Sequence, residues 1–100
     1  MIIIREVFTA KPGQASKLAK LFKKSFGIDQ NIRVMTDLAG NYNTVVVEMP
    51  MKNLAEFEKG MEEYKSGKPD SRMSPEIAEE MSKYTDMYLT GRREIFQVVE

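Results

Sequence analysis

Residues 32–49, IRVMTDLAGNYNTVVVEM, are the clearest indication of the fold in this chain of 100 residues. Both halves of this stretch, 32–39 and 42–49, are strand-like, and Gly40-Asn41 separates them. Two turn-forming residues between such runs are typical of a β-hairpin. A two-residue loop there would place Arg33 opposite Glu48 and would give the hairpin two distinct faces.

We expect the more apolar face of this hairpin to pack against helices. That face would carry Ile32, Val34, Thr36, Leu38, Asn43, Val45, Val47 and Met49. The opposite face is mixed, and it pairs unlike charges across the strands at Arg33 and Glu48. Its members would be Arg33, Met35, Asp37, Ala39, Tyr42, Thr44, Val46 and Glu48.

Helix and strand patterns alternate on both sides of the hairpin. An apolar stripe at helical spacing begins at Ala15, and Asn53 with Glu56 resembles a capping box. Ser74-Pro75-Glu76 is a typical helix start. The expected elements are a strand over 2–10, a helix over 15–26 with a cap at Gly27, the two hairpin strands, a helix from Asn53 that ends at Gly67, a polar loop over 67–73, a helix from Ser74 that ends at Gly91, and a strand over 92–99.

The element order β-α-β-β-α-α-β predicts an α+β, ferredoxin-like fold. A chain of this length allows one domain, so we expect residues 1–100 to form a single unit. The expected structure is a four-stranded antiparallel sheet with all helices on one face. The second face of the sheet would then be free of helices.

Alternation along the first and last strands assigns their side chains to the two faces. In the first strand, the even-numbered residues from Ile2 to Phe8 are more apolar, and we place them on the helix side. In the last strand, we place Phe96 and Val98 on the helix side. The open face would receive Ile3, Arg5, Val7, Thr9, Arg93, Ile95, Gln97 and Val99.

This open face combines apolar and charged residues. Monomeric proteins rarely expose large apolar patches to water, and an ordinary core contains fewer charges. Two such sheets packed face to face would bury the apolar part and enclose the polar part. We therefore predict a homodimer with two-fold symmetry that forms through the sheet.

Seven polar side chains assigned to the open face are the candidate site residues. In one interpretation they line a pocket for a small polar or anionic ligand, and Glu48 or Asp37 is available for proton transfer. In the other interpretation they form an ion-pair network that fixes the register of the dimer. The candidates are Arg5, Arg33, Asp37, Tyr42, Glu48, Arg93 and Gln97.

Two segments of this chain resemble a known superfamily. Residues 3–13, IIREVFTAKPG, run from a strand into Pro-Gly, and residues 45–49, VVVEM, precede a short helix with Leu54 and Phe57. Both segments resemble the dimeric α+β-barrel superfamily, which includes NIPSNAP-like proteins and small monooxygenases of the antibiotic-biosynthesis type. NIPSNAP-like domains often show an Arg-Glu-aromatic run before Pro-Gly, whereas here Val7 stands between Glu6 and Phe8.

The resemblance implies a barrel formed by two sheets across a dimer, with a pocket in the barrel or between each sheet and its helices. Activities in the superfamily range from cofactor-independent oxygenation and isomerisation to haem breakdown, and some members have no known activity. Haem-degrading members depend on a histidine ligand, and this chain has no histidine. The resemblance therefore implies no haem chemistry here.

Composition excludes several classes of site. The chain has no cysteine, which excludes disulfides, thiolate metal sites and a cysteine nucleophile. Without histidine it also lacks the commonest general base and metal ligand. The formal net charge is zero and no long apolar run occurs, so we expect no nucleic-acid or membrane partner. No signal peptide is recognisable, and we expect a cytoplasmic protein with no cofactor and no metal.

The expected function is that of a small-molecule-binding homodimer, or of a cofactor-independent monooxygenase-like or isomerase-like enzyme, with a polar pocket at the sheet face. The alternative is a non-enzymatic interaction or regulatory module whose sheet face is a dimer interface alone. An RNA-binding sheet is disfavoured, because that class needs exposed aromatic residues on its central strands. Residues 42–47, YNTVVV, hold one aromatic residue at their end.

Charge is unevenly distributed along the chain. Residues 1–33 contain seven basic and two acidic residues, and most of the basic ones lie in the expected first helix. The later helices are acidic, so we expect them to attract the first helix on the outer layer. A lysine face that binds acidic lipid or nucleic acid is the alternative, and it requires a basic patch without compensating acids.

Overall fold

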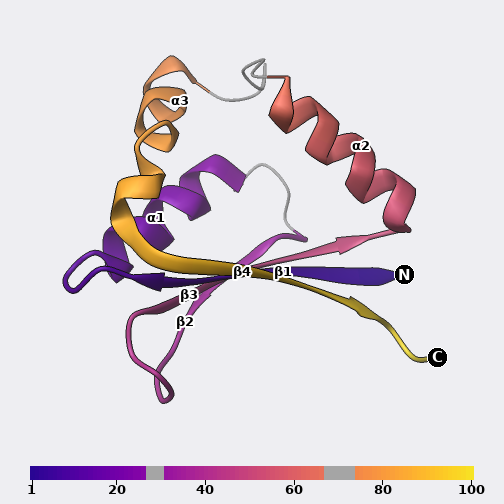
Figure 1. Ribbon diagram of the computed structural model, residues 1–100, viewed down its shortest axis with the longest axis horizontal. Helices are drawn as coiled ribbons and strands as arrows, with labels where there is room; N and C mark the ends of the chain where they lie inside the picture. The colour runs from indigo at the N-terminus through magenta and orange to yellow at the C-terminus, as the bar shows by residue number, and fades with distance from the viewer. Residues whose placement is uncertain (27–30, 67–73) are drawn as a thin grey trace.

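A four-stranded antiparallel sheet carries the helices on one face, and its other face is open (Figure 1). The structure is a computed structural model that describes residues 1–26, 31–66 and 74–100. The strand order is β2-β3-β1-β4, which confirms the predicted α+β, ferredoxin-like fold. The elements are β1 (Ile2–Ala10), α1 (Ala15–Phe26), β2 (Arg33–Thr36), β3 (Thr44–Met51), α2 (Leu54–Lys65), α3 (Pro75–Met81), a 3₁₀-helix (Tyr84–Met87) and β4 (Tyr88–Gln97).

The core lies between α1 and the central strands β1 and β3. Its buried members are Ala10, Leu18, Phe22, Val45 and Val47, so the apolar stripe predicted from Ala15 onward does face the sheet. Aromatic rings extend this core toward β4. The ring of Phe8 lies 5.1 Å from that of Phe22 and 4.9 Å from that of Tyr88, measured between centroids.

The hairpin has the predicted register but a longer connection. Arg33 pairs with Glu48 and Thr36 pairs with Val45, as a two-residue loop would require. The ladder stops there, and residues 37–43 form bends in place of the predicted strand ends. Gly40, Tyr42 and Asn43 all have positive φ, a backbone region in which a regular hairpin ladder does not continue.

Pro50 lies inside β3, which continues beyond residue 49, the predicted end of this strand. It pairs with Ile3 of β1. On its other side, the ladder with β2 ends at Arg33 and Glu48, so β3 is an edge strand beyond that point. A proline at an edge loses no ladder hydrogen bond, which explains why β3 continues to Met51.

The C-terminal part of the chain differs most from its prediction. The helix that begins after Ser74 ends at Met81, a 3₁₀-helix follows, and β4 begins at Tyr88. The Ser74 hydroxyl accepts a hydrogen bond from the Ile77 amide, as expected for an N-cap. The predicted cap at Gly27, the helix end at Gly67 and the loop over 67–73 lie outside the described residues.

The faces of β4 are the reverse of those predicted. Gly91 pairs with Phe8, and Ile95 pairs with Ile4, so odd-numbered residues of β4 share the helix side with the even-numbered residues of β1. Phe96 consequently lies on the open face, opposite Ile3. The prediction was wrong because β4 is an edge strand with apolar residues in both alternating sets, so its own pattern does not determine its orientation.

Candidate functional site

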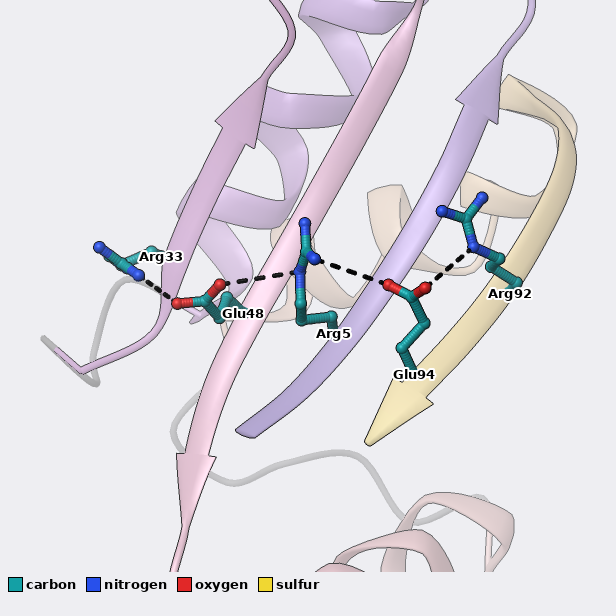
Figure 2. Close-up of polar contacts among 5 residues, drawn as sticks. All are labelled: Arg5, Arg33, Glu48, Arg92 and Glu94. Atoms are coloured by element: carbon teal, nitrogen blue, oxygen red, sulfur yellow. Dashed lines mark hydrogen bonds and ion pairs between the residues drawn. The ribbon is translucent and has the colours of Figure 1, made fainter. Parts of the chain in front are cut away.

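A row of alternating charges crosses the open face of the sheet from one edge to the other. Figure 2 shows the five side chains in line, contributed by all four strands. The strand register aligns these side chains, because Arg5 of β1 pairs with Glu48 of β3 on one side and with Glu94 of β4 on the other. The order across the sheet is Arg33, Glu48, Arg5, Glu94 and Arg92.

Each carboxylate of this charged row lies between two guanidinium groups. Glu48 Oε1 accepts a hydrogen bond from Arg33 Nη2, and Glu48 Oε2 lies 3.8 Å from Arg5 Nε. Glu94 Oε1 lies 3.7 Å from Arg5 Nη1, and Glu94 Oε2 lies 3.5 Å from Arg92 Nε. The alternation compensates each interior charge, which lowers the free-energy cost of removing the row from water.

The interior of the charged row is less solvated than its ends. The outer arginines, Arg33 and Arg92, are exposed, whereas Glu48 and Glu94 are partly buried. Arg5 Nε and Glu94 Oε1 are buried atoms that have no hydrogen-bond partner among the described residues. Their ion-pair contacts are longer than hydrogen bonds, so both atoms retain unused hydrogen-bonding capacity.

Apolar side chains flank the charged row on both sides. On one side the register aligns Met35, Val46 and Val7, of which Val46 and Val7 are 9% and 6% exposed. On the other side Ile3 pairs with Phe96, and the Phe96 side chain is 48% exposed. The open face is therefore a charged strip between two apolar strips, and none of the described helices lies over it (Figure 1).

The structure brings together three of the seven predicted site residues, Arg5, Arg33 and Glu48. Arg92 and Glu94 complete the charged row and were missed, because the faces of β4 were assigned in reverse. Charge complementarity between β1 and β4 could have indicated which face of the sheet each residue of β4 occupies. The observed register pairs Arg5 with Glu94 and Glu6 with Arg93, so both cross-strand pairs join opposite charges.

Arg93 and Gln97 lie on the helix side of the sheet, contrary to the prediction. Arg93 Nε donates a hydrogen bond of 2.5 Å to Glu6 Oε1. Its guanidinium group lies 5.2 Å from the ring centroid of Phe57 in α2, a cation–π contact. Arg93 therefore connects α2 to the sheet and is not part of the open face.

Asp37 and Tyr42 lie in the 37–43 loop, away from the charged row. Asp37 Oδ1 accepts a hydrogen bond of 3.2 Å from the Thr44 amide. Both residues line a groove between α1 and β2, together with Lys20 and Lys23. The seven predicted residues are thus divided among the open face, the helix side and this groove.

Two broader features of the described residues bear on function. No helix among them is long and apolar enough to cross a membrane. Within the same ranges, acidic side chains do not gather into a group of three that could hold a metal ion.

Comparison with protein-family models and with curated proteins gives no match to this sequence. Comparison with solved structures does find similar folds. An uncharacterized NIPSNAP domain protein from Burkholderia xenovorans is 13% identical, with a TM-score of 0.72 over 99% of this chain and 95% of that protein. A NIPSNAP family protein from Agrobacterium tumefaciens is 9% identical, with a TM-score of 0.72 over 99% of this chain and 93% of that protein.

An antibiotic biosynthesis monooxygenase-like protein from Deinococcus radiodurans is also similar. It is 11% identical, with a TM-score of 0.61 over 100% of this chain and 94% of that protein. At these identities the likeness concerns the fold. The chain therefore has the fold that NIPSNAP domain proteins and this monooxygenase-like protein share, as the resemblance in the sequence predicted.

Proposed function

We propose that the protein is a homodimer that forms through the open face of its sheet, and that the charged row fixes the register of the two subunits. The observation that supports this most directly is the composition of that face, a charge-compensated strip between two apolar strips. Burial of Phe96 and its neighbours would supply the free energy of association. The compensated row would make association specific at a small desolvation cost.

The exposed ends of the row suit this role. Arg33 and Arg92 project at the two edges of the sheet, where the rim of an interface stays hydrated. Glu48, Arg5 and Glu94 lie in the middle, where each charge already has an opposite neighbour. A face-to-face arrangement therefore buries paired charges and leaves the excess positive charge near water.

The test is sedimentation equilibrium on wild type, Phe96→Glu and Ile95→Glu. These two residues are adjacent and similarly exposed, at 48% and 40%, but they lie on opposite faces of β4. We expect the wild type to have twice the 11.5 kDa mass of one chain. Phe96→Glu should weaken dimerisation by at least about tenfold, because it places a charge in the apolar strip, and Ile95→Glu should not. A monomeric wild type, or equal weakening by both substitutions, would contradict the proposal.

A second candidate function is the binding of a small polar ligand between the two sheets, with or without catalysis. It is favoured by the two buried atoms, Arg5 Nε and Glu94 Oε1, that have no hydrogen-bond partner among the described residues. The antibiotic biosynthesis monooxygenase-like fold neighbour supports a monooxygenase as one form of this function. The alternative is a dimer interface alone, in which the partner subunit satisfies both atoms.

An NMR titration of the dimer with malonate separates these two possibilities. Malonate is a small dianion that can accept hydrogen bonds from arginine. Saturable shifts of the Arg5, Glu48 and Glu94 amides would support a ligand site in the sheet face. Absence of these shifts, in a protein that is dimeric by sedimentation, would favour the non-enzymatic module.

A further inference from the structure

The groove between α1 and β2 has features that the proposed dimer does not use. It has a volume of about 560 Å³ and lies on the helix side of β2, away from the open face. Its wall is apolar where Ala15 and Ala19 of α1 approach Val34 of β2. Alanine at positions i and i+4 leaves space on this side of the helix that a larger side chain would fill.

Two lysines and one carboxylate, that of Asp37, line this groove, so its charged side chains carry a net positive charge. Lys20 and Lys23 are exposed and line the groove, and neither forms an ion pair among the described residues. Lys24, on the neighbouring side of α1, pairs with Glu80 of α3 at 3.9 Å, as the acidic later helices predicted. In the groove, Asp37 offsets only part of the lysine charge, and its Oδ1 already accepts a hydrogen bond from the Thr44 amide.

Tyr42 stands at the same rim in an unusual backbone conformation. Its φ is 65° and its side chain is 82% exposed. A bulky residue rarely adopts positive φ, and such strain often accompanies a functional role. No packing in the core requires a tyrosine at this exposed position. A ring held beside two unpaired lysines and a small apolar wall is suited to contact with a flat ligand.

We propose that this groove binds a small aromatic carboxylate, whose ring packs between Tyr42 and the alanine wall and whose carboxylate pairs with Lys20 and Lys23. Charge-assisted hydrogen bonds from lysine would orient the anion, and apolar contact would supply the remaining affinity. The site is independent of the dimer interface, because its residues lie on α1, the helix side of β2 and the 37–43 loop.

The test is an NMR titration with 2-naphthoate. We expect a Kd of about 1 mM or tighter, which is reasonable for a ligand of this size, and shifts confined to α1, β2 and the 37–43 loop. The double variant Lys20→Glu/Lys23→Glu should weaken binding at least about tenfold, because it removes the charge-assisted contacts. Lys59→Glu, on the exposed surface of α2, is the control for a change of charge elsewhere.

Further ligands and variants separate the contributions of ring and charge. Acetate, which has the charge without the ring, and 2-naphthol, which has the ring without the charge, should both bind more weakly than 2-naphthoate. Tyr42→Asn should weaken binding while leaving the melting temperature equal or higher, because asparagine tolerates positive φ better than tyrosine. Ala19→Leu, verified as folded by circular dichroism, should block the groove.

Three outcomes would overturn the proposal. They are no saturable shift with 2-naphthoate, shifts centred outside the groove, and unchanged affinity in the Lys20→Glu/Lys23→Glu variant. A failure of Ala19→Leu to fold leaves the lysine and tyrosine variants as the deciding measurements. Because Phe96→Glu leaves the groove intact, the site should bind 2-naphthoate in that variant as well, whether or not the protein dimerises.

Discussion

Gly91 of β4 illustrates how closely single residues are packed near the aromatic cluster. A Cβ atom at this position would lie 3.1 Å from Cδ1 and 3.2 Å from Cε1 of Phe8. The Phe8 ring has little freedom to move away, because it also contacts Phe22 and Tyr88. Gly60, in the middle of α2, has no atom within 4 Å of the corresponding position.

The same substitution at these two glycines should therefore have opposite effects on stability. Gly91→Ala should lower the free energy of unfolding by about 1–3 kcal/mol, because the added methyl group displaces a packed ring. Gly60→Ala should raise it by about 0.5–1 kcal/mol, because alanine is the better helix former. Urea denaturation measures both. An equal change in the free energy of unfolding at the two positions would show that the Phe8 ring leaves room for a side chain at position 91.

At the scale of elements, α2 depends on its first turn and on a small contact with the sheet. Asn53 Oδ1 accepts a hydrogen bond of 3.0 Å from the Glu56 amide. Glu56 Oε2 accepts a hydrogen bond of 2.8 Å from the Lys52 amide. The predicted capping pair is therefore present, but its second hydrogen bond comes from the residue before Asn53 and not from the Asn53 amide. Phe57 contacts Arg93 of the sheet, whereas Leu54 is exposed. The helix thus has little buried surface to stabilise it.

Loss of the cap should accordingly loosen α2 ahead of the rest of the fold. Asn53→Ala should destabilise the helix by about 1 kcal/mol, which corresponds to roughly fivefold faster amide exchange within α2. Exchange in α1 should not change, since α1 is anchored by buried Leu18 and Phe22. Hydrogen exchange followed by NMR measures both helices. Asn41→Ala, in the exposed loop, is the matched control and should leave α2 unchanged.

The whole molecule has two layers, a sheet and the helices on one of its faces, and no described helix covers the other face (Figure 1). In the proposed dimer, the sheet of the second subunit would cover this open face. Val7 and Val46 on the two central strands are already buried beneath the open face, whereas Phe96 on the edge strand is half exposed. A partner would therefore gain most of its contact area toward the edges of the sheet.

If the dimer is the stable form, stability should depend on protein concentration. Each tenfold increase in concentration should add about 1.4 kcal/mol of stability per dimer, because the folded state is then linked to association. The melting temperature of the wild type should rise accordingly in a dilution series followed by circular dichroism. In Phe96→Glu it should not change with concentration. A concentration-independent wild type would indicate that the open face stays free.

Several features were predictable from sequence because they depend on neighbours along the chain. The element order, the apolar stripe of α1 and the caps of α2 and α3 follow from short-range periodicity and local hydrogen bonds. The hairpin register was predictable for the same reason, and with it the pairing of Arg33 with Glu48. Alternation along the first strand also placed Arg5 on the open face, so three members of the charged row were located from sequence.

Tertiary structure decided what depends on contacts between distant segments. β4 has apolar residues in both alternating sets, so pairing with β1, more than eighty residues away in sequence, determines that Glu94 faces Arg5 and that Arg93 faces Glu6. The groove beside Lys20 and Lys23 likewise depends on tertiary structure, because residues of α1, β2 and the 37–43 loop line it together. Periodicity specifies which residues share a face of one element, but the face that an edge strand presents is determined by its register against its neighbour.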